Sequence, residues 1–155
     1  MVRKGKVLGF GNPLKATLPL SIRTGVWASL VSSVMLIGIG VFWVVLPGAS
    51  EGAFAIEADT AAAEKFARIA AIFKAVGDVL PAVFVLIALY RLQFRLVGYF
   101  QLATIILVVL IDILTWRAFV PDPSIRYILM HVPFAIPMAI AAFCFLIPHN
   151  SYNEQ

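Results

Sequence analysis

The sequence predicts an all-α integral membrane bundle of four antiparallel transmembrane helices. Of its 155 residues, 62% are hydrophobic and only 13% are charged, which is too little polar material to cover a soluble domain of this size. Four apolar stretches have about the 20 residues that a bilayer span requires. Basic residues lie at the ends of these stretches, as is typical of membrane topology signals. The chain is therefore expected to form one domain in the lipid bilayer.

The predicted domain organisation follows these stretches. A basic segment, residues 1–24, precedes a membrane domain, residues 25–148, and a short polar tail, residues 149–155, follows it. The spans are expected at residues 25–46, 67–90, 97–119 and 127–147. Seven Lys and Arg residues lie on the side of the termini and four on the other side, so both termini are expected to be cytoplasmic.

The first span carries a stripe of small residues, Gly25, Ser29 and Ser33, at intervals of four. Such a stripe allows another helix to approach closely. The close neighbour is expected to be a helix of the same chain, a second copy or a membrane partner; contact of the two hydroxyls with a ligand is the alternative.

The polar loop before the second span contains a helix start signal and one candidate ligand residue. Asp59 or Thr60 is expected to cap the next helix, because a short oxygen side chain accepts from free backbone N–H groups. Glu64 and Arg68 are spaced for an i,i+4 ion pair. Glu51 has no local partner and follows a Pro-Gly break, so it is a candidate ligand-binding residue on a loop that folds over the bundle.

Charged residues occur inside the second span. Lys74 and Asp78 are four residues apart and so lie on one helical face, just before Pro81, where a local bend is expected. A lone charge at mid-membrane costs from about 3 to more than 10 kcal/mol, so these two side chains are expected to point inward and to pair.

The third and fourth spans add further polar groups. The third span carries a polar stripe that should face protein, and its end carries an interfacial aromatic residue. These residues are Gln101, Thr104, Asp112, Thr115 and Trp116, of which Thr104, Thr115 and Trp116 are candidate ligand contacts. The fourth span contains His131 together with Pro133 and Pro137.

Three of these residues are expected to meet at one depth, and a fourth is expected about one turn below them. At 1.5 Å per helical residue, Lys74 and Asp112 lie roughly 10 Å, His131 roughly 8 Å and Asp78 roughly 16 Å below the same surface. One lysine does not neutralise two carboxylates, so one aspartate is expected to hold a proton and to act as an acid, with His131 exchanging that proton. Lys74, Asp78, Asp112 and His131 are therefore the candidate catalytic residues. The alternative is that the buried charges only fix which helices pack together.

Several chemistries have no support in the sequence. One cysteine, Cys144, and two histidines give no metal-ligand spacing, and there is no phosphate-binding glycine loop or G-x-S-x-G. No cofactor and no metal is expected. Nucleic-acid binding is not expected either, because the basic residues flank spans and do not form a patch with aromatic residues.

Part of the chain resembles a known group of membrane proteins. Gly38-Ile39-Gly40 before Leu46-Pro47, the run from Lys74 to Asp78, and Asp112 are similar to the layout of small four-helix DoxX-like families. The resemblance covers the first three spans. It implies the four-helix membrane fold and says little about chemistry.

Three functions remain open on the sequence alone. The first is binding or conversion of a small lipophilic molecule at the Lys/Asp/His cluster, as a cofactor-independent isomerase or cyclase if it is an enzyme. The second is a non-catalytic accessory subunit that docks a partner, or a second copy of the chain, through Gly25, Ser29 and Ser33. The third is a proton-coupled small transporter, although no inverted repeat is visible.

Overall fold

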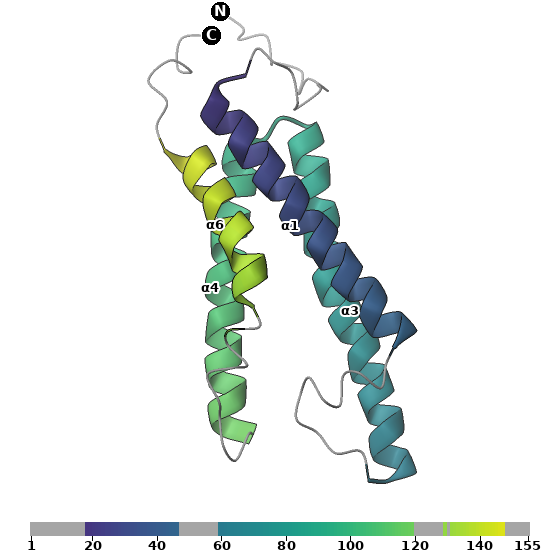
Figure 1. Cartoon of the computed structure of the whole chain (residues 1–155). Coiled ribbons are helices and arrows are strands. Elements are labelled where there is room, and N and C mark those ends of the chain that lie inside the picture. The colour runs from purple at the N-terminus through teal and green to yellow at the C-terminus, as the bar shows by residue number, and fades with distance from the viewer. Residues whose placement is uncertain (1–17, 47–58, 120–128, 130, 148–155) are drawn as a thin grey trace, which may run out of the picture.

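The computed structural model describes residues 18–46, 59–119, 129 and 131–147. This part of the chain contains four helices and no strand, which confirms the predicted all-α class: α1 (Leu20–Val45), α3 (Ala61–Tyr90), α4 (Phe94–Phe119) and α6 (Val132–Leu146) (Figure 1). Three of them, α1, α3 and α4, are long and apolar enough to cross a membrane. The chain is therefore a membrane protein built as a helical bundle.

The second helix starts earlier than expected because the residues before it form a good N-terminal cap. α3 begins at Ala61, whereas the predicted span begins at residue 67. The Ala63 backbone N–H donates to Thr60 Oγ1 at 3.2 Å, so Thr60 is the cap. One turn further, Arg68 Nη2 lies 2.5 Å from Glu64 Oε1. Both local predictions are confirmed.

The fourth helix is shorter than expected. α6 has 15 residues, Val132–Leu146, whereas the predicted span covers residues 127–147 and a span requires about 20. Pro133 lies in its first turn, where the missing N–H costs nothing, so the helix begins there readily. Residues 120–128 and 130, which include the beginning of the predicted span, lie outside the described part of the chain.

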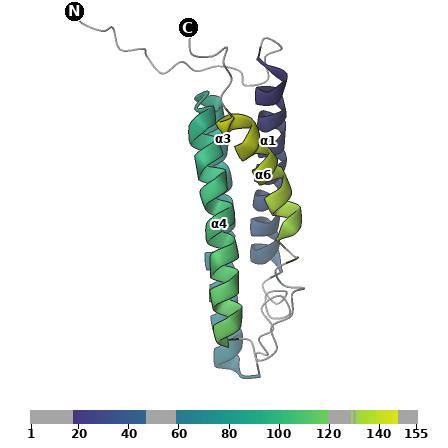
Figure 2. The same cartoon turned by 90° about the vertical axis from the view of Figure 1, so that its left-hand side faces the viewer.

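Each helix runs opposite to the helix before it in the sequence. α1 packs along both α3 and α6, and α4 packs along α6, whereas α3 and α4 contact each other much less (Figures 1 and 2). The start of α1, the turn between α3 and α4 and the end of α6 lie together at one end of the bundle, which we name the turn end (Figure 1). The end of α1 and the start of α3 lie at the opposite end, which we name the far end.

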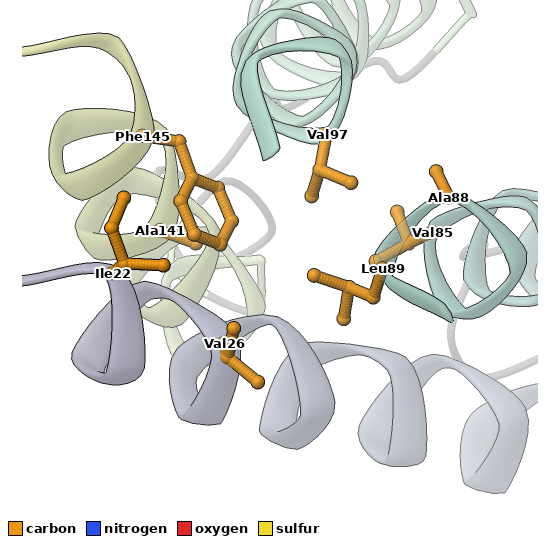
Figure 3. Packing of buried hydrophobic residues seen from close by; sticks show 8 residues of the cluster. All are labelled: Ile22, Val26, Val85, Ala88, Leu89, Val97, Ala141 and Phe145. Carbon is orange, nitrogen blue, oxygen red and sulfur yellow. The ribbon is translucent and has the colours of Figure 1, made fainter. Parts of the chain in front are cut away.

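The core is concentrated at the turn end. Side chains from all four helices meet there: Ile22, Val26, Val85, Ala88, Leu89, Val97, Ala141 and Phe145 (Figure 3). Two glycines allow this packing, because a Cβ on Gly25 would lie 2.6 Å from the Phe145 ring and one on Gly98 would lie 3.0 Å from Phe145 Cβ. A second, smaller cluster towards the far end joins α1 and α3, through Trp43, Ala71 and Ala75.

The small-residue stripe of α1 faces the inside of the bundle. Gly25, Ser29 and Ser33 are all buried within the chain, with Gly25 against α6 and Ser29 bonded to α4. The prediction of close helix packing through this stripe is thus fulfilled by the chain's own helices. Docking of a second copy or a membrane partner through this stripe stays a prediction.

Candidate functional site

The Lys74–Asp78 pair forms as its spacing predicts. Lys74 Nζ lies 2.5 Å from Asp78 Oδ1, and the Asp78 side chain is only 10% exposed, whereas the Lys74 side chain is 35% exposed. The second carboxylate oxygen, Asp78 Oδ2, is buried and has no hydrogen-bond partner among the described residues. A buried acceptor without a partner raises the free energy of the folded state, because it has lost its hydrogen bonds to water and no protein group replaces them.

This pair lies deep in the apolar part of α3. Arg68 and Arg91 bracket the apolar stretch, and Asp78 is about 15 Å along the helix from the first and about 20 Å from the second. A charge at this depth is stabilised only by a partner or by a water-filled environment. Lys74 balances the single charge of Asp78, and Oδ2, which has no partner among the described residues, can accept from a further hydrogen-bond donor.

A polar cluster nearer the turn end fixes α4 against α1. Ser29 Oγ donates to Gln101 Oε1 at 3.4 Å, and Gln101 Nε2 donates to Ser32 Oγ at 3.3 Å. Ser32 Oγ in turn donates to the Ser29 carbonyl at 3.0 Å. We name Ser29, Ser32 and Gln101 the serine–glutamine cluster. All three side chains are fully buried, and each one is hydrogen-bonded.

This cluster sets the depth of Asp112. α1 and α4 run in the same direction, so eleven residues beyond Ser29 and Gln101 the two chains reach Gly40 and Asp112. Gly40 packs directly on α3, where its Cβ position lies 2.5 Å from Val79 Cγ2 and 3.1 Å from the Ala75 carbonyl oxygen. The backbone of Asp112 therefore lies near the depth of the Lys74–Asp78 pair.

The position of His131 follows from a second contact. Phe145 of α6 packs beside Gly98 of α4, and fourteen residues, about 21 Å of helix, separate Gly98 from Asp112 and Phe145 from His131. The backbone of His131 is therefore level with that of Asp112. It is the N-cap of α6, where its carbonyl accepts from Ala135 N–H at 2.9 Å, and the residue is half-buried.

The structure brings two of the predicted site residues together, and several others have side chains outside the part of the chain that it describes. Lys74 and Asp78 are bonded. Asp112, Thr115 and Trp116 belong to α4, but their side chains lie outside the described part, as does the whole of Glu51. Thr104 donates to the Phe100 carbonyl of its own helix at 2.8 Å. A side-chain cluster of all four catalytic candidates stays a prediction, supported by the common depth of their backbones.

The sequence predicts only part of the serine–glutamine cluster. The polar stripe of the third span predicts that Gln101 faces protein, but it does not indicate the partners of Gln101 on α1, Ser32 among them. A glutamine inside an apolar span is itself the signal, because an amide in the membrane requires donors and acceptors from a neighbouring helix. Ser29 and Ser32, one turn apart, are the groups on α1 that supply them.

Comparison with models of protein families, with curated proteins and with solved structures gives no match. The resemblance to the DoxX-like families therefore stays a prediction. Among the described residues, no group of three or more His, Cys, Asp and Glu residues is arranged to hold a metal ion.

The chemistry available at this depth is hydrogen bonding and proton transfer. Asp78 Oδ2 can accept a hydrogen bond or a proton, and Lys74 offers two further N–H donors beyond the one directed at Asp78. Both groups act in an apolar environment, where electrostatic interactions are stronger than in water. Such an arrangement suits a small polar head group attached to an apolar body.

Proposed function

We propose that this chain is a multi-pass membrane protein that binds a small lipophilic molecule at Lys74 and Asp78 and converts it by acid–base catalysis. The ligand's apolar body lies among the helices or in the adjoining lipid, and its polar head group donates to Asp78 Oδ2. One observation carries the proposal: a carboxylate oxygen buried deep in an apolar helix has no partner among the described residues. A pair that served packing alone would be expected to satisfy both oxygens.

The proposed chemistry is a proton shift within the ligand, as in an isomerisation or cyclisation. Asp78 takes or gives the proton at the bound head group, and Asp112 or His131, whose backbones lie near that depth, supplies the second proton-transfer group. Lys74 holds Asp78 in position and balances its charge. Such a reaction consumes and releases one proton and requires no redox partner.

Mass spectrometry of organic extracts from the purified protein tests the proposal. We expect a defined small lipophile with the wild-type chain and its depletion with Asp78→Asn, which keeps the size of the side chain but changes its charge. Glu64→Gln is the matched control, because it alters another i,i+4 pair of the same helix at an exposed position. Bulk lipid alone from both the wild-type chain and Asp78→Asn would refute the ligand site.

The proposed orientation places the turn end in the cytoplasm. Arg23, Arg91 and Arg95 lie at this end, in agreement with the excess of Lys and Arg expected on the cytoplasmic side. A Gln93→Cys variant in a Cys144→Ala background tests it by labelling with a membrane-impermeant maleimide. We expect labelling only after the inner face is exposed, and labelling of intact cells would reverse the orientation.

A further inference from the structure

We infer that the ligand reaches Asp78 sideways from the bilayer, between α3 and α4, and that Gly77 sets the size of molecule that passes. The inference rests on the proposed function, since it names the route to that same site. It is drawn from the way in which α3 and α4 separate, from the position of Gly77 beside the ion pair, and from the apolar surroundings of that position.

α3 and α4 touch through a pair of aromatic rings. The ring centroids of Phe84 and Phe100 are 4.5 Å apart. Gly77 lies two turns before Phe84 and Leu107 two turns after Phe100, so each lies on the face that carries its ring. If the antiparallel helices stayed in contact, Gly77 would meet Leu107.

That second contact is absent. Among the described residues, a Cβ built on Gly77 would have no atom of another helix within 4 Å, and Leu107 is 57% exposed. The two helices therefore diverge beyond the ring pair, and Figure 1 shows their far ends well apart. The contrast with Gly40 is direct, because a Cβ there would collide with Val79.

Gly77 borders the ion pair. It follows Lys74 by three residues, so the two are neighbours on the helix surface, and Asp78 is the next residue along the chain. The exposed third of the Lys74 side chain lies beside this open position, whereas Asp78 lies behind it on the buried stripe of α3. A molecule passing Gly77 therefore meets Lys74 first and Asp78 next.

The surroundings of Gly77 are apolar. Phe73, Val76 and Leu80 of α3 are all exposed and lie within one turn of Gly77. At this depth of a membrane helix the exposed faces meet lipid chains, so the molecule that enters has an apolar body. Its head group carries a hydrogen-bond donor, because the free group at the site is an acceptor.

Labelling with dicyclohexylcarbodiimide, an apolar reagent that adds to carboxyl groups within membranes, measures this route without any natural ligand. We expect peptide mass spectrometry of the full chain in liposomes to find the adduct on Asp78. We expect Gly77→Trp to slow this labelling about tenfold, which corresponds to an increase of about 1.36 kcal/mol in the activation free energy. Gly77→Leu should slow it less. Gly38→Trp is the matched control, since its Cβ position is equally open, on an exposed part of α1, and it should leave the rate unchanged.

Three results would overturn the route. The first is equal labelling of the wild-type chain and Gly77→Trp. The second is labelling of Asp78 only after unfolding in detergent. The third is faster labelling by a water-soluble carbodiimide that Gly77→Trp does not slow. The reagent takes the place of the ligand, so the route and the proposed function are tested separately. If Asp78→Asn loses the natural lipophile but Gly77→Trp is labelled as fast as the wild-type chain, the route is disproved and the proposed function is not. A Gly77-dependent rate without any bound lipophile would disprove only the proposed function.

Discussion

The serine–glutamine cluster and the Lys74–Asp78 pair differ in how their hydrogen bonds are satisfied. Both place polar side chains inside an apolar bundle. In the first, neutral groups from α1 and α4 bond to one another, and each side chain has a partner. In the second, two charged groups of one helix pair, and a carboxylate oxygen remains free among the described residues. The serine–glutamine cluster thus closes its hydrogen bonds within the protein, whereas the ion pair leaves one acceptor for the proposed ligand.

The two sites also differ in the number of helices that pack around them. Near the serine–glutamine cluster, four helices contribute to one core (Figure 3). At the depth of the ion pair, the close packing found among the described residues joins α1 and α3, and Leu107 of α4 is exposed. Within the described part of the chain, the turn end therefore holds most of the close packing between helices, and fewer helices pack around the pair.

The largest expected effect is the loss of the α1–α3 contact in Gly40→Leu. Its Cβ would lie 2.5 Å from Val79 and 3.1 Å from a backbone oxygen that cannot move aside. We expect a loss of about 3 kcal/mol or more in the free energy of unfolding, at the upper end of overpacking costs. Thermal unfolding in detergent measures it. Gly38→Leu, whose Cβ position is open, should unfold near the wild-type temperature; equal losses in both variants would contradict the close contact.

A smaller loss is expected when the ion pair is broken from one side. Asp78→Leu leaves Lys74 without its partner and should destabilise by about 2 kcal/mol, less than for a fully buried pair because lysine can extend its amine towards the interface. Adding Lys74→Met should restore the wild-type stability and abolish ligand binding. If the double variant is instead less stable than Asp78→Leu, the pair is a packing element and the site hypothesis loses its basis.

Gln101→Leu should cost about 1 kcal/mol, because it removes two weak hydrogen bonds in an apolar medium. It tests the register on which the depth of Asp112 depends. Thermal unfolding in detergent measures this loss. An unfolding temperature equal to that of the wild-type chain would show that the apolar core alone fixes α4 against α1.

The smallest effect is expected for Ser33→Ala. The Ser33 hydroxyl is buried and has no hydrogen-bond partner among the described residues, so its removal should change stability by no more than about 0.5 kcal/mol. Ser32→Ala, one residue away, should cost more because it breaks the serine–glutamine cluster. Similar unfolding temperatures for the two variants would remove the distinction between them.

The helices and the ion pair could be predicted from the sequence because their signals are local. Apolar length gives α1, α3 and α4, Thr60 gives the start of α3, and a spacing of four gives the Lys74–Asp78 bond. The partners of Gln101 could not be predicted, because they depend on the side on which α4 packs.

The divergence of α3 and α4 also has no signal in the sequence. Gly77 and Leu107 fit a closed helix pair as well as an open one, and the difference depends on the sum of many packing contacts. Likewise, the composition of residues 127–147 suits a full span, and the described helix is shorter because Pro133 favours a start there.

That Lys74 and Asp78 belong to a single helix has a consequence for how the bundle moves. An ion pair formed across two helices would break whenever those helices separated, and each separation would leave two unpaired charges in the apolar interior of the membrane. Here both charges travel with α3 as one dipole. A movement of α4 relative to α3 would therefore separate no charges, so that by the proposed route molecules of different width would enter at nearly the same electrostatic cost.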